Sequence, residues 1–301
     1  MQRILFLFFS ICFLCSSSTY LTAQQTEDNI LYVIETVDGN RYIGSILSQD
    51  EETVQLRTKT LGDITIQRDQ IGSMELLDAA QIVGGNYLWD TPFVTRYYVG
   101  SSAYSLRKGE GYYQNSWIFY NNINVGLTDN IDVGIGIVPL FLFTFGSGDG
   151  ITPIWLTTKI ALPVEKDKFN LAAGGVYANV LGGDTNGGGQ IYGVSTFGSR
   201  NRNVSLGIGW FYGADEGLAE RPTFSFSTMQ RGKPKWAFVS ENYFFGVGDE
   251  GLVILSAGAR YLGDKISLDM SGFTFVYTGG GQDVFPILPW LSVSVPFGGR
   301  N

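Results

Sequence analysis

From residue 93 onward the chain is a series of long segments in which apolar residues alternate with small or polar ones. This feature limits the possible folds most strongly, because alternation with a period of two predicts β-strands. The segments run to roughly 9 to 14 residues, whereas soluble strands average about 5 or 6 and tilted membrane strands need about 9 to 11. We count twelve, at residues 94–106, 113–127, 131–143, 153–164, 168–181, 188–199, 202–213, 221–231, 234–246, 251–263, 266–278 and 287–298.

The connections between these segments alternate in kind. Every second connection is a tight turn, and those between are rich in glycine and acidic residues, as in GSGDG and GADEGLAE. Short turns at one end and longer loops at the other are typical of outer-membrane barrels. An even strand number places both ends of this region at the turn end. The predicted turns are Thr128-Asp129-Asn130, Glu165-Lys166-Asp167, Arg200-Asn201, Gly232-Lys233-Pro234 and Asp264-Lys265.

The stretch NINVGLTDNIDVGIGIV, residues 122–138, shows what the alternation implies. Its aliphatic residues share one face, with Leu127 expected opposite Ile131, and Asn122, Asn124 and Asp132 share the other. A soluble sheet would bury the aliphatic face, whereas a membrane barrel would turn it to lipid. Aromatic residues near both strand ends would form interfacial girdles and favour lipid. They are Trp117, Phe119, Phe141, Phe143, Trp210, Tyr212, Phe244, Tyr277 and Trp290 toward the loops, and Phe169, Trp236, Phe238, Tyr261 and Phe297 toward the turns.

Residues 93–301 thus resemble the bacterial outer-membrane β-barrel class, of the porin-like kind, in pattern and not through a diagnostic motif. The resemblance implies an outer-membrane location and a role in passive transport, or a structural or accessory role in the envelope. One alternative is a secreted soluble β protein that binds glycans or protein partners. Another is a membrane-embedded hydrolase that works without histidine.

Charged residues are scarce within the segments. A charge on the lipid face costs about 2 to 4 kcal/mol at the bilayer midplane, so these side chains should face the lumen. If Asp264-Lys265 is a two-residue hairpin turn, Arg260 lies opposite Asp269 and the two form an ion pair. Such residues would be either a selectivity lining or a salt-bridged network that fills a narrow barrel. The candidate lumen-lining residues are Asp132, Lys159, Glu241, Arg260 and Asp269.

Composition excludes several activities. The 301 residues include no histidine, which excludes Ser-His-Asp catalysis and His-ligated zinc. The formal net charge of −8 disfavours a nucleic-acid partner. The loops GDTNGGGQ and GADEGLAE lack the ordered ligand spacing of a calcium loop. We therefore expect no catalytic residues, no cofactor and no metal, and a protein that is not an enzyme.

Residues 1–23 have the features of a secretory signal peptide. Arg3 supplies the positive start, an apolar stretch follows to Cys15, and cleavage is expected after Ala23. Cys12 and Cys15 both lie within this segment, so the mature chain has no cysteine. Its fold must depend on hydrogen bonds and burial alone.

Residues 30–77 predict a separate small β domain. Five short strands are divided by turn residues at Asp38-Gly39, Asp50-Glu51 and Leu61-Gly62. The stretches VDG at 37–39, YIGSI at 42–46 and VQL at 54–56 resemble the Sm-like and SH3-like small barrels. RNA-binding Sm families usually carry an Arg-Gly pair late in the barrel, where this chain has Gln67-Arg68-Asp69. The resemblance therefore implies an interaction module and not an RNA-binding domain.

The sequence as a whole predicts an all-β chain. After the signal peptide come the small domain at 30–77, a linker at 78–92, and an antiparallel transmembrane β-barrel of about twelve strands at 93–301. We expect the barrel in the cell outer membrane, in contact with its lipid, and the small domain in the periplasm. An envelope protein is the expected partner of residues 30–77. Substrate, oligomeric state and whether the lumen is open or plugged are left undecided.

Overall fold

The computed structural model describes residues 30–77, 82–83, 86–88, 91–139, 152–165, 167–181, 186–246, 251–263, 265–279 and 283–298. These belong to two compact units, residues 1–77 and 78–301, and each is described by itself. The expected signal peptide, the GSGDG loop, and the residues Phe141, Phe143, Lys166 and Asp264 lie outside the described residues. None of the described residues forms a helix long and apolar enough to cross a membrane.

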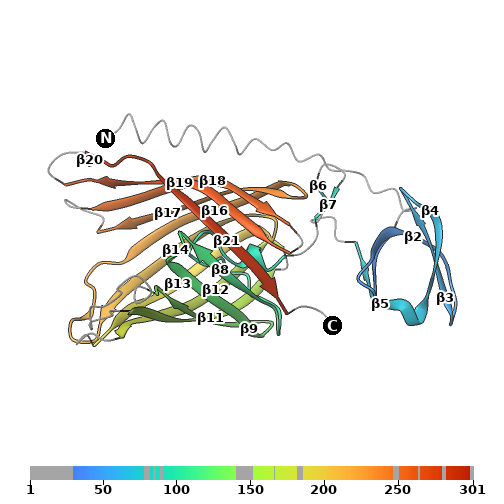
Figure 1. Cartoon of the computed structure of the whole chain (residues 1–301), viewed down its shortest axis with the longest axis horizontal. Coiled ribbons are helices and arrows are strands. Elements are labelled where there is room, and N and C mark those ends of the chain that lie inside the picture. The colour runs from blue at the N-terminus through green and yellow to red at the C-terminus, as the bar shows by residue number, and fades with distance from the viewer. Residues whose placement is uncertain are drawn as a thin grey trace. The chain divides into compact units, whose positions relative to one another are not determined.

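The first unit is a five-stranded antiparallel sheet in the order β4-β3-β2-β1-β5 (Figure 1). The five strands predicted for residues 30–77 are all present. Its core is small and aliphatic, formed by Ile34, Val54, Leu56 and Ile66. The strands are β1 (Leu31–Thr36), β2 (Arg41–Gln49), β3 (Thr53–Thr58), β4 (Gly62–Gln67) and β5 (Ile71–Leu76).

Gly44 lies in the middle of β2, where a glycine ordinarily weakens a strand. A Cβ atom at this position would come within 2.2 Å of the Arg57 carbonyl oxygen on β3. Only glycine allows the two backbones to approach so closely, and the β2–β3 register shifts shortly afterwards, between Ile46 and Ser48. The close pairing of β2 with β3 therefore requires a glycine at position 44.

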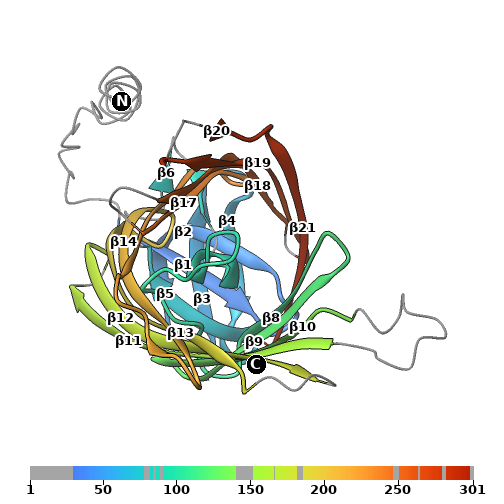
Figure 2. The same cartoon turned by 90° about the vertical axis from the view of Figure 1, so that its left-hand side faces the viewer.

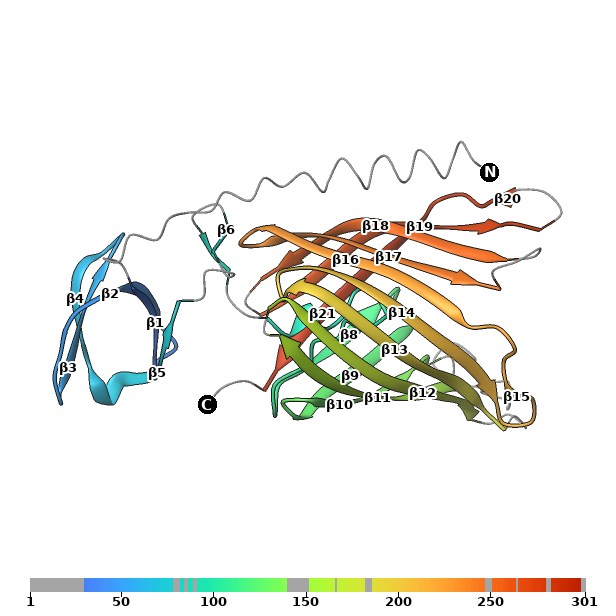
Figure 3. The same ribbon diagram turned by 180° about the vertical axis from the view of Figure 1, so that it is seen from behind.

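The second unit is a closed antiparallel barrel of twelve long strands (Figures 1 and 2). Each long strand pairs with the next along the chain, and β21 pairs back with β8. Figure 3 shows the wall from behind, where β11 to β14 and β16 lie side by side. The long strands are β8 (Gly111–Ser116), β9 (Tyr120–Thr128), β10 (Ile131–Ile137), β11 (Thr152–Glu165), β12 (Phe169–Leu181), β13 (Gly188–Ser199), β14 (Arg202–Gly213), β16 (Thr223–Lys233), β17 (Trp236–Phe245), β18 (Leu252–Leu262), β19 (Ser267–Tyr277) and β21 (Leu288–Phe297).

Four short strands of two residues each complete the described strands of this unit. β15 (Gly217–Leu218) extends the sheet beside β14, β20 (Asp283–Val284) extends it beside β19, and β6 (Ile82–Val83) pairs with β7 (Asn86–Tyr87) apart from the barrel. We call the barrel end that carries the β9–β10, β11–β12, β13–β14, β16–β17 and β18–β19 connections the turn end. The opposite end is the loop end.

Two of the predicted barrel strands are wrong. One is absent and the other is two strands, so the predicted number of barrel strands is still correct. Residues 94–106 form no strand of the wall. The segment predicted as one strand at 113–127 is two strands, β8 and β9, joined by a tight turn at 117–119. That turn contains no Gly, Pro, Asn or Asp, the residues that usually announce one. Instead Trp117 and Ile118 adopt positive φ angles of 52° and 69°, which bulky residues rarely do.

The hairpin at 122–138 keeps the predicted faces but not the predicted register at its turn. Ile131 pairs with Thr128 and Asp132 with Gly126, so Leu127 is an extra residue and does not lie opposite Ile131. The shift is a β-bulge, which one strand accommodates by a local twist. Beyond it the alternation is regular, and Asn122 and Asp132 are buried while Ile135 is exposed.

The two faces of the barrel wall differ sharply in charge. Outward-facing positions carry exposed apolar side chains along the length of the strands. For example, the exposed fraction is 61% for Ile160, 49% for Leu206 and 42% for Val295. Within the described residues of the twelve long strands, the outward charged side chains are confined to strand ends at the turn end: Glu165, Arg202 and Lys233. The other charged residues of these strands are all buried: Asp132, Lys159, Arg231, Glu241, Arg260 and Asp269.

Candidate functional site in the barrel interior

Residues 92–107, which we call the interior segment, fold into the barrel near its turn end. The segment starts with a short 3-10 helix, η3 (Pro92–Thr95), and then reverses direction at a turn in which the Tyr97 N–H donates to the Gly100 carbonyl at 2.8 Å. Most of its residues are buried, but Val99 at the tip is 51% exposed. Its apolar side chains pack with Met229, Val239 and Leu262 of the wall. The stretch predicted as the first barrel strand is thus the core around which the barrel closes.

Arg260 and Asp269 lie opposite each other on β18 and β19, as the hairpin spacing predicts, and form an ion pair. Arg260 Nε donates to Asp269 Oδ1 at 2.5 Å, and its Nη1 donates to the Phe93 carbonyl at 2.6 Å. Arg96 of the interior segment binds the other carboxylate oxygen, with Nη1 to Oδ2 at 3.1 Å. Arg260 is 0% exposed and Asp269 2%. The pair therefore anchors the first half of the interior segment.

Asp132 and Lys159 form a second ion pair on β10 and β11, with Lys159 Nζ 3.0 Å from Asp132 Oδ2. Lys159 Nζ also donates to the Tyr104 carbonyl at 2.6 Å, and Asp132 Oδ1 accepts from the Leu106 N–H at 3.1 Å. Each partner therefore binds backbone of the interior segment as well as the other partner. This pair holds the second half of the segment.

Glu241 on β17 holds the tip. Its carboxylate accepts the N–H groups of Tyr98 at 2.6 Å, Val99 at 3.0 Å and Gly100 at 2.6 Å. The Tyr243 hydroxyl donates to the same carboxylate at 2.5 Å. Successive backbone N–H groups that converge on one carboxylate satisfy a buried charge without a cation.

Uncharged side chains complete the attachment, and sequence analysis did not single them out. The Tyr97 hydroxyl donates to Asn203 Oδ1 at 2.8 Å, the Tyr98 hydroxyl donates to the Val239 carbonyl at 2.7 Å, and Thr196 Oγ1 accepts the Ala103 N–H at 2.8 Å. Alternation does place Thr196 and Asn203 on the inner face. Nothing in their spacing shows that they bind a chain segment from outside the wall.

All five residues named from the sequence as candidate lumen lining face the interior. Asp132 and Lys159 border the larger cavity described below, Glu241 borders a smaller one, and Arg260 and Asp269 lie against the interior segment. Together with Arg96 they make three cations and three carboxylates, so their formal charges cancel. Each of the five binds backbone or a side chain of the interior segment. A selectivity role for these residues stays a prediction.

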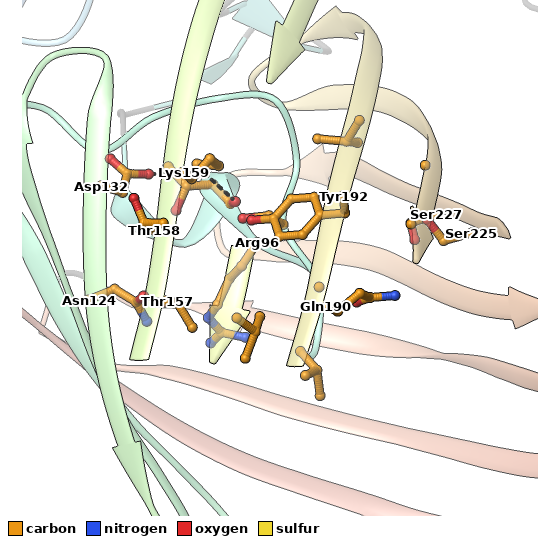
Figure 4. A pocket seen from close by; sticks show the side chains of 18 of the residues that line it. Arg96, Asn124, Asp132, Thr157, Thr158, Lys159, Gln190, Tyr192, Ser225 and Ser227 are labelled. Atoms are coloured by element: carbon orange, nitrogen blue, oxygen red, sulfur yellow. Dashed lines mark hydrogen bonds and ion pairs between the residues drawn. The ribbon is translucent and has the colours of Figure 1, made fainter. Parts of the chain in front are cut away.

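The loop-end half of the interior holds a cavity of about 380 Å³. Its floor is the tip of the interior segment, at Val99, Gly100 and Ser101. Figure 4 shows side chains from several strands around the space, with Tyr192 and Gln190 on one side and Asn124 and Thr157 on another. Apart from the paired residues Arg96, Asp132 and Lys159, the polar lining is uncharged: Asn122, Asn124, Thr157, Gln190, Tyr192, Thr223, Ser225, Ser227 and Tyr243 are its main members.

A second, smaller cavity of about 170 Å³ lies on the other side of the same tip. Its lining is mainly aromatic and aliphatic, and includes Ile254, Phe273, Phe275 and Trp290. Trp290, which the sequence places in the loop-side aromatic band, faces inward here and lies 6.4 Å from the Tyr98 ring. The loop-end half of the interior is therefore polar against β9 to β16 and apolar against β18, β19 and β21.

Among the residues that the structure describes, no group of three or more His, Cys, Asp or Glu side chains is placed to hold a metal ion. The interior carboxylates Asp132, Glu241 and Asp269 already accept N–H groups or bind cations of the chain. Within the described residues, the arrangement offers a chamber whose polar lining is uncharged apart from the paired Arg96, Asp132 and Lys159.

No protein-family model matches the sequence, and no curated protein does. Among solved structures, the chain is similar to the NanC porin, with 7% identity and a TM-score of 0.39 over 62% of this chain and 97% of that one. It is also similar to the CymD monoaromatic hydrocarbon channel, with 9% identity and a TM-score of 0.39 over 91% of this chain and 88% of that one. A third similar structure is the outer-membrane expressed OmpT of Vibrio cholerae, with 8% identity and a TM-score of 0.33 over 90% of this chain and 94% of that one. At such identities and scores we take nothing about function from these proteins.

Proposed function

We propose that this chain is an outer-membrane β-barrel, not an enzyme, that admits small solutes from its loop end and is closed toward its turn end by the interior segment. The observation that carries the proposal is the separation of charge across the wall. Within the described residues of the long strands, outward positions carry no charged side chain except at the turn-end strand termini, and the other charged residues of the strands are buried.

Lipid explains this separation better than water does. A charged side chain facing the bilayer midplane costs about 2 to 4 kcal/mol, whereas a soluble protein has no reason to exclude charge from its surface. Monomeric soluble proteins rarely expose apolar patches larger than a few hundred Å². The exposed aliphatic and aromatic residues of this barrel continue around its wall, which disfavours the alternative of a secreted soluble β protein.

The interior segment determines what kind of transport the barrel can support. Buried ion pairs of the wall and the Glu241 carboxylate hold this segment in place, and we infer that it blocks the turn-end half of the lumen. Passage of a solute requires this segment to move. We therefore propose passive, gated transport and not a permanently open pore.

The location that we propose for the small domain rests on the orientation of the barrel in the membrane. The barrel begins and ends at its turn end, where β8 starts and β21 finishes, and in outer-membrane barrels the short turns are periplasmic. Residues 30–77 precede the interior segment, so we propose that they lie in the periplasm. There they would serve as the interaction module for an envelope protein.

Leu206→Arg tests the membrane proposal. Leu206 faces outward in the middle of β14 and is 49% exposed. In lipid, an arginine there should prevent stable insertion. The measurement is gel electrophoresis before and after boiling: the wild type should migrate differently in the two samples, and the variant should not. The matched control is Leu218→Arg, because Leu218 is 57% exposed in the short loop-end strand β15.

The soluble alternative predicts a different pattern. There both arginine variants would be tolerated equally, since surface substitutions usually change stability by less than about 0.5 kcal/mol. Recovery of the mature protein and of Leu206→Arg in a detergent-free soluble fraction would contradict the proposal.

A further inference from the structure

We propose that the larger cavity is a binding site for a neutral, ring-shaped polyhydroxylated molecule of the size of a mono- or disaccharide. The inference rests on the proposed function, because it takes the loop end as the side from which solutes enter. Its volume of about 380 Å³ lies toward the lower end of the range of roughly 300 to 1,000 Å³ typical of small-molecule sites.

Two flat aromatic surfaces line the cavity, and glycines on the neighbouring strands hold them in place. Trp155 stacks on Tyr120, with ring centroids 4.8 Å apart and an interplanar angle of 23°. A Cβ atom on Gly136 would come within 2.0 Å of the Trp155 ring, so only glycine lets the indole lie against the wall. The C–H face of a sugar ring stacks on such surfaces through weak contacts with the π system.

Tyr192 provides the second surface. A Cβ atom on Gly174 would lie 2.6 Å from its Cζ, so this ring also needs a glycine beside it. Figure 4 shows Tyr192 extending across the cavity, with Gln190 two residues away on the same strand. The two aromatic surfaces come from β11 and β13, which the intervening strand β12 separates.

Hydrogen-bonding groups lie between these surfaces and have capacity to spare. Within the described residues, the side chains of Gln190, Ser225 and Ser227 make no hydrogen bond to the protein. Asn122 Oδ1 is buried and likewise has no partner there. Amides and hydroxyls that both donate and accept suit the hydroxyl groups of a sugar. A polar group left unsatisfied in the absence of a ligand gains most when a ligand satisfies it.

The charge distribution selects a neutral ligand. The cavity's charged residues are Arg96, Asp132 and Lys159, and each is engaged in a buried ion pair. Arg96 Nε has no hydrogen-bond partner among the described residues, but Arg96 is only 2% exposed and does not present this group to the cavity. A charged ligand would therefore enter without a counter-charge, which is costly in a confined site.

The test is calorimetric titration of the purified, detergent-solubilised full-length mature protein. Glucose and maltose serve as neutral probes, glucuronate and glucosamine as charged probes. We expect saturable binding of at least one neutral sugar, and binding of the charged probes that is at least about tenfold weaker. The double variant Gln190→Ala/Ser225→Ala should weaken neutral-sugar binding roughly tenfold, as expected for two lost hydrogen bonds.

The matched control removes one amide and one hydroxyl from the outer face, as Gln230→Ala/Ser195→Ala, and should bind like the wild type. Absence of saturable binding by both neutral sugars would overturn the inference. So would tighter binding of glucuronate, which would assign the site to an anion held by Arg96. A sample that shows the heat-dependent gel shift yet binds no sugar would overturn the ligand class while leaving the membrane proposal intact.

Discussion

The turn-end and loop-end halves of the barrel interior are built from the same strands and the same alternation, yet they are filled differently. In the turn-end half, Arg260, Lys159 and Glu241 all bind the interior segment, and the space is packed. In the loop-end half, Gln190, Ser225 and Ser227 face a cavity and lack protein partners among the described residues.

The comparison shows that an inward polar residue has no fixed role in a barrel. Where the chain supplies a partner, the residue contributes to stability. Where it does not, the residue is available to a ligand. Variants in the two halves should therefore separate stability from binding, and the following predictions run from the largest expected effect to the smallest.

Arg260→Ala should have the largest effect. It leaves Asp269 buried with only Arg96 as a cationic partner and removes the donors to the carbonyls of Phe93 and Tyr97. Breaking a buried ion pair in this way typically costs about 3 to 5 kcal/mol. The measurement is the temperature at which the folded gel mobility is lost.

Lys168→Ala is the matched control for that variant. Lys168 and Glu165 form an ion pair at the turn end in which both side chains are largely exposed. Exposed pairs contribute about 0 to 1 kcal/mol, so the folded mobility should survive to nearly the wild-type temperature. Equal losses in the two variants would show that the interior segment is not held by the buried pair.

Glu241→Gln should loosen the tip of the interior segment without unfolding the barrel. The neutral amide offers one acceptor oxygen to the N–H groups of Tyr98, Val99 and Gly100, where the carboxylate offers two. Hydrogen bonds to a charged group are worth about 1.5 to 3 kcal/mol each, so transient opening should increase at least about tenfold.

The measurement is the rate of maleimide labelling of an introduced Ala103→Cys. No other cysteine of the mature chain would react, because Cys12 and Cys15 lie in the predicted signal peptide. Ala103 is 1% exposed, so labelling reports movement of the segment. Glu165→Gln, at an exposed carboxylate, is the control. An unchanged labelling rate in Glu241→Gln would argue against the carboxylate as the tip anchor.

Gly100→Ala should displace the tip by steric means. The added Cβ would lie 2.4 Å from the Tyr243 hydroxyl and 2.6 Å from a Glu241 carboxylate oxygen. Overpacking of this kind costs about 1 to 3 kcal/mol, and the Ala103→Cys labelling rate should rise. Gly232→Ala, where nothing lies within 4 Å of the added atom, should leave labelling at the wild-type rate.

Gln190→Ala should change stability least. The side chain borders the cavity and has no hydrogen-bond partner among the described residues, so its loss should alter the free energy of unfolding by less than about 0.5 kcal/mol. The same gel assay measures this. A destabilisation as large as that of Arg260→Ala would remove the distinction between the two halves.

Much of the barrel could be predicted because alternation and turn spacing are local signals. The pairing of Arg260 with Asp269 follows from one turn, and β13 and β14 have the bounds that their sequence predicts. Register at the 128–131 turn could not be predicted, because a bulge inserts a residue without changing which faces are apolar.

The interior segment could not be predicted for a different reason. FVTRYYVGSSAYSL, residues 93–106, contains the aromatic and β-branched residues of a strand, so local propensity is the same whether it joins the wall or enters the lumen. Tertiary contacts decide between the two. The partners of Tyr97 and Ala103, which are Asn203 and Thr196, lie about a hundred residues further along the chain.

The central claim, that residues 92–107 close the barrel, is tested most directly by conductance across a planar bilayer. We predict no steady conductance for the wild type. Glu241→Gln should show brief openings, which an oxidised Ala103→Cys/Thr196→Cys cross-link abolishes and reduction restores. A steady wild-type conductance that the cross-link leaves unchanged would contradict the claim.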